Sequence, residues 1–134
     1  MSRADIEDAI AMQMRRPKNP HIAQKKLQEG LLLYDQRRWQ EGNLYRAIRT
    51  LQKSMAYDGR RFFSEREHRD IYEDAVKELT KALWERYTNA LLRQADGRRR
   101  DANRLFRQIQ DMVPDMENPI YLKANEHLGR LSSR

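Results

Sequence analysis

Hydrophobic residues recur along this chain at intervals of three and four positions, the spacing that places side chains on one face of an α-helix. Proline, glycine and Asn-Pro pairs separate these stretches and are typical of helix boundaries. The pattern predicts an all-α protein of about six helices, with one long helix at its centre.

The first two predicted helices begin at recognisable capping residues. Ser2 with Asp5 predicts the start of the first, which should end before Pro17. Asn19-Pro20 predicts the start of the second, because asparagine caps a helix and proline lacks the N–H that would be unpaired there. Gly30 interrupts its apolar stripe and would let a neighbouring helix approach closely. The expected buried positions are Ile6, Ile10 and Met14 in the first helix and Ala23, Leu27, Leu31 and Tyr34 in the second.

A third helix is predicted from about Trp39, after the second ends near Arg37-Arg38. It should end at Tyr57-Asp58-Gly59, where glycine allows a left-handed cap. Its expected buried face contains Leu44, Ala47, Ile48, Leu51 and Met55.

Ser64-x-x-Glu67 is a capping-box pattern that opens the longest predicted helix. No glycine or proline occurs from Glu65 to Ala95, a run that would span roughly 45 Å at about 1.5 Å per residue. Between Ile71 and Leu92 the apolar positions cover more than one face. This arc predicts a helix that is packed from two sides.

Two further helices are expected after Asp96-Gly97 ends the central one. The fifth is predicted over residues 99–112, before Pro114. Asn118-Pro119 repeats the earlier Asn-Pro pattern and opens a last helix with charges on its outer side, as a terminal cap would have. The expected buried positions are Ala102, Leu105, Phe106, Ile109 and Val113 in the fifth helix and Tyr121, Ala124, Leu128 and Leu131 in the last.

Two segments of the chain match when one is shifted by 58 residues, so that Arg46 to Gln52 falls on Arg104 to Gln110. In the later copy, Trp84-x2-Tyr87-Thr88-x2-Leu91 is followed by Ala102-x3-Phe106 and then by Pro114. This arrangement resembles the tetratricopeptide repeat (TPR), whose pattern is W-x2-L-G-x2-Y, then A-x3-F, then P.

The resemblance covers residues 83–114 well and residues 27–56 loosely, since Leu44-x3-Ile48 replaces Ala-x3-Phe in the earlier copy. It implies a right-handed solenoid of antiparallel helix pairs that binds proteins or peptides. The single all-helical domain, residues 1–134, would then contain an N-terminal helical arm (1–18), a degenerate first helix pair (19–59), a TPR-like helix pair (64–114) and a C-terminal capping helix (118–134).

Composition adds charge and compartment to this picture. The chain has 27 Lys and Arg against 20 Asp and Glu, a net charge of +7 that attracts anionic surfaces. It has no cysteine, which excludes disulfides and thiolate sites. Acidic residues follow Met1 where a signal peptide would be basic, and the longest apolar run, Leu31 to Tyr34, is far shorter than the ~20 residues that span a bilayer. We expect a cytoplasmic protein without membrane insertion.

Glu65-x-x-His68 is the strongest metal-like spacing, because residues i and i+3 share a helix face. A di-iron bundle needs two such motifs and two more carboxylates, and this chain has one motif. We interpret Glu65 as compensation of the helix dipole, and His21 and His127 as surface histidines. No catalytic motif occurs, so we predict no enzyme activity, no cofactor and no metal. A site assembled from distant residues stays open.

Basic clusters lie at the ends of the predicted helices, where a cation near a C-terminus contributes about 0.3–1 kcal/mol. If successive helices are antiparallel, Arg37-Arg38 and Arg98-Arg99-Arg100 fall at one end, and Arg15-Arg16 and Arg60-Arg61 at the other. The adjacent Phe62-Phe63 would either fill the core or stack on a nucleic-acid base, and we favour the core.

The predicted function is a non-catalytic scaffold or adaptor that binds a protein partner or mediates assembly of a larger complex. Its expected contact residues are the aromatic side chains Tyr72, Trp84, Tyr87, Phe106 and Tyr121. The alternative is a basic helical protein that binds RNA or DNA, with an affinity that falls steeply with salt. Its expected contact residues are Arg37, Arg38, Arg98, Arg99 and Arg100.

Overall fold

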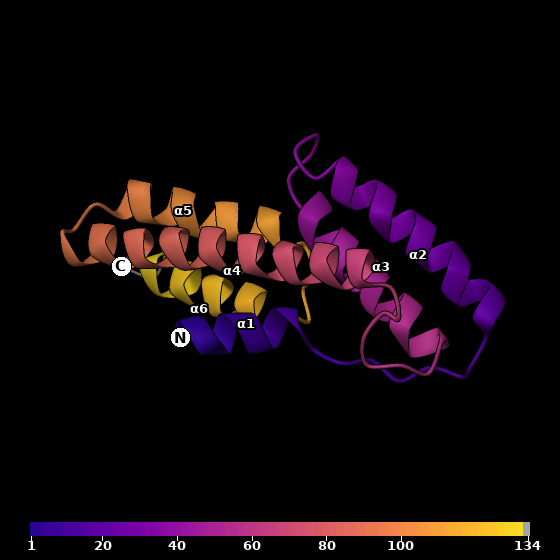
Figure 1. The fold of residues 1–134 in the computed structure, drawn as a ribbon. Coiled ribbons are helices and arrows are strands. Elements are labelled where there is room, and N and C mark those ends of the chain that lie inside the picture. The colour runs from indigo at the N-terminus through magenta and orange to yellow at the C-terminus, as the bar shows by residue number, and fades with distance from the viewer. Residues whose placement is uncertain (133–134) are drawn as a thin grey trace. The chain divides into compact units, whose positions relative to one another are not determined.

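The computed structural model describes the backbone of residues 1–132 and the side chains of residues 1–129. These residues form helices and no strands, as Figure 1 shows, which confirms the all-α prediction. The helices are α1 (Arg3–Ile10), α2 (Pro20–Asp35), α3 (Asn43–Tyr57), α4 (Arg66–Ala95), α5 (Arg99–Met112) and α6 (Pro119–Ser132).

Three helices begin at the capping residues predicted from the sequence. The Asn19 side chain accepts a hydrogen bond from the backbone N of Ile22 at 3.2 Å, and the Asn118 side chain accepts one from the N of Ile120 at 2.9 Å. At α1 the Ser2 hydroxyl accepts from the N of Asp5 at 3.1 Å, while the Asp5 carboxylate accepts from the N of Ser2 at 2.8 Å. The hydrogen bonds from Ser2, the backbone one first, lower the pKa of Asp5.

Other helix boundaries differ from the prediction, because tertiary contacts and turns set them. Helix α1 ends at Ile10, well before Pro17, and the Ile10 carbonyl accepts a hydrogen bond from the Gln52 side chain at 2.7 Å. The predicted buried residue Met14 therefore lies beyond the helix and is half-exposed. A cap at Ser64 would start α4 at residue 65. The helix instead begins at Arg66, because its first backbone hydrogen bond runs from the N of Arg69 to the carbonyl of Glu65.

Helix α3 begins four residues after the predicted start at Trp39. The intervening turn ends at Gly42, whose φ of 88° lies in the left-handed region that favours glycine. The Asn43 side chain closes the turn by donating to the carbonyl of Gln36 at 2.9 Å. Trp39 consequently lies outside the helix and is 78% exposed.

Contacts within the chain define two compact units, and the boundary between them falls inside α4. One unit contains residues 10–79, and the other contains residues 1–9 with the chain from residue 80 onward. Both units contain buried apolar side chains, among them Leu51 in the first and Phe106 in the second.

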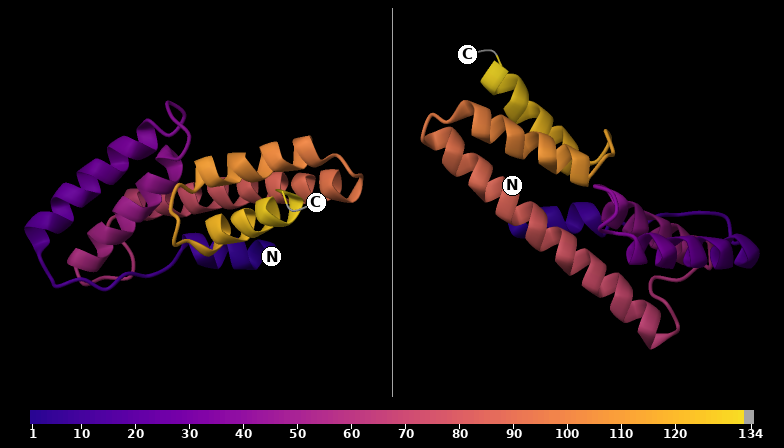
Figure 2. Two further views of the ribbon diagram at one scale, coloured as in Figure 1. Left: turned by 180° about the vertical axis from the view of Figure 1, so that it is seen from behind. Right: turned by 90° about the horizontal axis from the view of Figure 1, so that it is seen from above.

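In the unit of residues 10–79, α2 and α3 form an antiparallel hairpin that lies side by side in both views of Figure 2. The Ser54 hydroxyl donates to the carbonyl of Ala23 at 2.7 Å, and the backbone N of Asn19 donates to the carbonyl of Tyr57 at 2.8 Å. The helices lie close together at Gly30, where an added side-chain carbon would lie 2.7 Å from Leu51 Cδ2, as the lack of a side chain predicts. The core contains Leu51, Met55 and Phe63, with Leu27, Leu31 and Tyr72 packed against it.

In the other unit, the second half of α4, α5 and α6 form antiparallel pairs in chain order. Tyr87 of α4 contacts Phe106 of α5, and the Gln110 side chain of α5 donates to the carbonyl of Tyr121 on α6 at 3.4 Å. Asn118 donates to the carbonyl of Ala9 at 3.1 Å, which attaches α1 to the start of α6. The predicted buried position Leu131 lies outside the described side chains.

Candidate functional site

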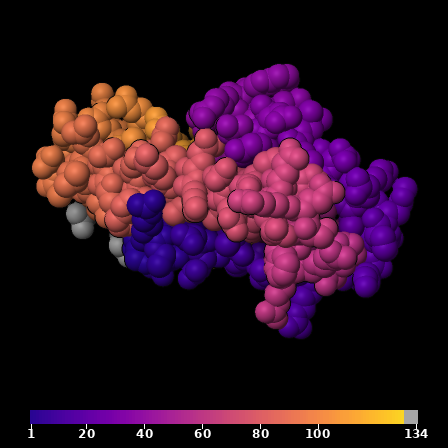
Figure 3. All heavy atoms as spheres, in the orientation of Figure 1, coloured from indigo at the N-terminus to yellow at the C-terminus, as the bar shows by residue number. Residues whose placement is uncertain are grey.

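The second half of α4 carries an apolar stripe on the side that the unit leaves uncovered. Trp84, Leu91 and Ala95 recur at i, i+7 and i+11, and Leu92 lies beside them. Leu91 is 36% and Leu92 62% exposed, whereas Leu83 on the inner face is 1% exposed. In Figure 3 one side of this part of α4, coloured salmon to orange, lies open on the face shown. We call Trp84, Leu91, Leu92 and Ala95 the α4 stripe.

An aromatic cluster fixes the inner edge of the α4 stripe. The Trp84 ring stacks on Tyr87 with 6.5 Å between ring centroids and 29° between ring planes. Tyr87 meets Phe106 edge to face at 6.4 Å, and Phe106 stacks on His127 at 4.6 Å with 4° between the planes. These ring contacts fix the orientation of the half-buried Trp84 side chain at the border of the α4 stripe.

The interpretation of His127 as a surface histidine was wrong. Its side chain is only 6% exposed, and its Nε2 lies 3.4 Å from the Tyr87 hydroxyl. The sequence did carry a signal for this burial: His127 follows Ala124 by three positions and so falls on the apolar face of α6.

The five aromatic residues predicted to contact a partner lie at different depths. Tyr87 and Phe106 are core residues, and Trp84 and Tyr121 are half-buried. Tyr72 is also half-buried and belongs to the unit of residues 10–79, where its hydroxyl accepts from the Gln52 side chain at 3.1 Å. Burial raises the pKa of Tyr72, and the hydrogen bond from Gln52 opposes this shift. Of these five residues, Trp84 is the one that belongs to the α4 stripe.

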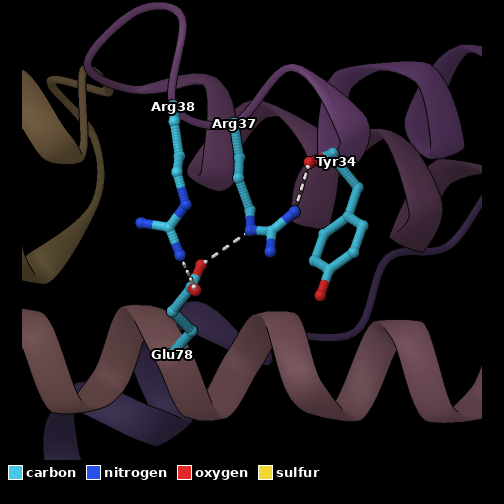
Figure 4. Close-up of polar contacts among 4 residues, drawn as sticks. All are labelled: Tyr34, Arg37, Arg38 and Glu78. Atoms are coloured by element: carbon cyan, nitrogen blue, oxygen red, sulfur yellow. Dashed lines mark hydrogen bonds and ion pairs between the residues drawn. The ribbon is translucent and has the colours of Figure 1, made fainter.

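The arginines of the predicted nucleic-acid surface are partly paired within the protein. Figure 4 shows Arg37 and Arg38 converging on Glu78, each at 3.1 Å from a carboxylate oxygen. Arg37 also donates to the carbonyl of Tyr34 at 3.0 Å and lies 4.2 Å above the Tyr34 ring centroid. Arg37 thus joins the end of α2 to α4 and has a structural role.

The second predicted arginine group lies at the start of α5. Arg98 pairs with Asp101 at 3.5 Å, and Arg104 pairs with the same carboxylate at 3.5 Å. Arg99 and Arg100 are exposed in the first turn of the helix. This position is opposite to the one that the helix dipole favours, because a helix N-terminus carries partial positive charge.

Phe62 and Phe63 are adjacent in the sequence but lie in different environments. Phe63 is 8% exposed and packs in the core with Leu51 and Met55, as favoured. Phe62 is 65% exposed. Adjacent residues in an irregular loop point to different sides, so the pair did not have to share one environment.

Glu65 and His68 form a single contact, with 3.7 Å between the carboxylate and the ring nitrogen, and Phe63 covers the His68 ring edge to face at 6.1 Å. His21 is exposed, as expected for a surface histidine. Among the residues that the structure describes, no three histidine or carboxylate side chains gather as a metal site would require. Within the same residues, no helix has both the length and the apolar character needed to cross a bilayer.

Comparison of this chain with known protein families, with curated proteins and with solved structures found no match. The exposed α4 stripe and the arginine clusters are the surface features of this chain that point to a function.

Proposed function

We propose that this protein is a non-catalytic interaction scaffold that binds a protein partner, or a second copy of itself, through the α4 stripe. The supporting observation is the exposure of Leu91 and Leu92 beside Trp84 on one helix face. Exposed leucines next to a supported aromatic ring have the composition of an interface core, where tryptophan is enriched among energetically dominant residues. A partner that covers these apolar side chains removes them from water, which stabilises the complex.

The helix pair formed by α4 and α5 supports the proposed likeness to TPR scaffolds. Ala102 is completely buried, consistent with a small residue where helices meet, and Phe106 is completely buried between Tyr87 and His127. These are the roles that the Ala-x3-Phe motif implies. A right-handed solenoid, an adaptor role and a cytoplasmic location belong to the same proposal.

The experiment compares variants of the α4 stripe with a matched variant on another helix. The proposal predicts that the wild type forms a species heavier than the single chain. Leu91→Ser/Leu92→Ser should abolish this species, because it removes apolar contact area and leaves the core intact. Leu32→Ser, at a leucine that is 55% exposed on α2, should leave that species unchanged. Masses measured by sedimentation would reveal the difference, and equal thermal unfolding midpoints would show that all variants are folded.

Nucleic-acid binding through Arg37 and Arg38 has weaker support, since Glu78 offsets part of their charge and Arg37 makes two further contacts. Arg99 and Arg100 stay exposed, but the sequence around them, residues 96–104, contains no aromatic residue that could stack on a base. We therefore propose protein binding through the α4 stripe, and not nucleic-acid binding through these arginines, as the main function.

A further inference from the structure

An open hollow of about 650 Å³ lies in the unit of residues 10–79, between the segment that follows α1 and the loop that follows α3. Four arginines line it: Arg15 and Arg16 from the first segment, and Arg60 and Arg61 from the second. Met14 and Ala56 provide apolar surface between them. We call this the arginine hollow. Arg15-Arg16 and Arg60-Arg61 therefore lie close together, the part of the sequence prediction that concerns these two pairs.

The end of α3 creates the hollow. Gly59 has a φ of 69°, and the N of Arg60 donates to the carbonyl of Met55 at 2.9 Å, which completes a left-handed glycine cap. This cap turns the chain and directs the following arginines toward residues 15 and 16. The Lys18 stem passes the same turn, 3.6 Å from the place that a Gly59 side-chain carbon would occupy. The turn thus concentrates positive charge.

Within the described part of the chain, most of this charge lacks a carboxylate partner. Asp58 pairs with Arg60 at 3.1 Å. Over residues 1–129, no carboxylate pairs with Arg15, Arg16 or Arg61, and no Asp or Glu is among the residues that line the hollow. Like charges held together repel one another, and a multivalent anion in the hollow would relieve this repulsion.

An exposed aromatic ring lies next to the arginines. Arg60 lines both the arginine hollow and an adjoining smaller hollow, and Phe62 lines the second one. Phe62 is 65% exposed, so its ring is accessible. Glu65 and His68 also line the smaller hollow, and the Glu65 carboxylate would repel a phosphate there. Phosphate is thus favoured on the side of Arg15, Arg16 and Arg61, and an uncharged planar group on the side of Phe62.

We propose that this surface binds single-stranded nucleic acid, with backbone phosphates on Arg15, Arg16 and Arg61 and an unpaired base on Phe62. Cationic grooves beside exposed aromatic rings are the usual way in which proteins hold single strands, because every base has a face that can stack. A duplex keeps its bases paired and stacked, so it would use the arginines but not Phe62. The site is independent of the α4 stripe.

The test is fluorescence anisotropy with a short labelled oligouridylate, at salt concentrations from low to physiological. Arg15→Ala/Arg16→Ala should weaken binding at least tenfold at low salt. It should also make the slope of log K against log salt shallower by roughly 1.4, which is two phosphates at about 0.7 each for single strands. The matched control is Arg99→Ala/Arg100→Ala, which removes the same charge from an exposed pair at the start of α5 and should leave both quantities nearly unchanged.

Phe62→Ala tests the base contact separately. It should weaken binding by about fivefold to a hundredfold and leave the salt slope unchanged, because stacking involves no counterion release. Trp39→Ala, at another exposed aromatic residue in the same unit, should have no effect. Thermal unfolding of each variant confirms that it is folded, and Leu91→Ser/Leu92→Ser should bind the oligonucleotide like the wild type.

Three results would overturn the proposal. The first is no binding of the oligouridylate at low salt. The second is an equal loss in Arg99→Ala/Arg100→Ala, which would mean attraction by net charge alone. The third is wild-type affinity of Phe62→Ala for the oligouridylate, together with a phosphopeptide or polyphosphate that competes as well as unlabelled oligouridylate. This result would identify a site for phosphate groups without bases.

Discussion

Gly30 is the residue that sets how closely α2 and α3 pack. A side-chain carbon at this position would lie 2.7 Å from the Leu51 Cδ2 and 3.2 Å from the Leu51 backbone N. The first distance is shorter than a carbon contact can be and the second is tight, and the backbone atom cannot rotate away. The glycine is therefore required by the packing and not by its own backbone conformation.

Gly30→Ala should lower the free energy of unfolding by roughly 1–3 kcal/mol, because overpacking outweighs the gain in helix propensity of about 1 kcal/mol. Gly129→Ala is the matched control: it lies within α6, and among the side chains that the structure describes nothing is within 4 Å of the added carbon. That variant should be as stable as the wild type or more stable. Urea unfolding measures both, and a Gly30→Ala protein as stable as Gly129→Ala would contradict the observed packing.

Tyr72 predicts a component of the pH dependence of stability. Burial raises its pKa in the folded state, so above about pH 10 the unfolded chain loses the proton first and the folded state loses stability as pH rises. Tyr72→Phe cannot lose this proton. The gap in unfolding free energy between wild type and Tyr72→Phe should therefore narrow as pH rises above 10.

At neutral pH, Tyr72→Phe should be less stable than the wild type, because it lacks the hydrogen bond from Gln52. This difference is the baseline against which the alkaline values are compared. Chemical denaturation at neutral and alkaline pH measures the gap. A gap that stays constant from pH 7 to the alkaline limit would show that the Tyr72 hydroxyl titrates alike in the folded and unfolded chains.

At the scale of elements, the two Asn-Pro starts look alike in the sequence and differ in the fold. Asn19 caps α2 at a half-buried position, whereas Asn118 is 1% exposed and also donates from its side-chain amide to the carbonyl of Ala9. Replacement by aspartate keeps the capping oxygen and removes the amide donor. The two positions can therefore be compared by the same substitution.

Asn118→Asp should lower the unfolding free energy by about 1–3 kcal/mol, because it leaves a buried carbonyl unpaired and places a carboxylate near it. Asn19→Asp should change it by less than about 1 kcal/mol in the stabilising direction, since a negative charge suits a helix N-terminus. Thermal unfolding compares them. Equal effects at the two positions would mean that the hydrogen bond to Ala9 contributes nothing to attaching α1.

The helix boundaries show what local sequence determines. The Asn-Pro caps, the glycine cap at Gly59 and the bounds of α5 were predicted, because each depends on residues within one helix turn. For α1 the sequence predicted an end before Pro17, which is correct, but not the end at Ile10, whose carbonyl is bound by Gln52 from a distant helix. The late start of α3 depends on the turn at Gly42, which the apolar pattern does not contain.

At the scale of the whole molecule, the sequence predicted that charged clusters and exposed apolar residues occur, but not which of these residues stay accessible in the fold. The sequence indicated arginine clusters and a wide apolar arc on the central helix. Only the fold shows that Glu78 engages Arg37 and Arg38 and that Phe62 is exposed. It also shows that Leu91 and Leu92 lie beyond the packed part of the arc. Such outcomes depend on contacts between residues far apart in the sequence.

The most direct test of the interaction-scaffold proposal is the native mass of the protein isolated from its own cell, compared between wild type and Leu91→Ser/Leu92→Ser. The proposal predicts that the wild type is found in a species clearly heavier than the 16.2 kDa chain, and that the variant is found at the mass of the chain alone. A wild type that occurs only as a 16.2 kDa monomer, or a heavy species that the variant forms equally well, would contradict it.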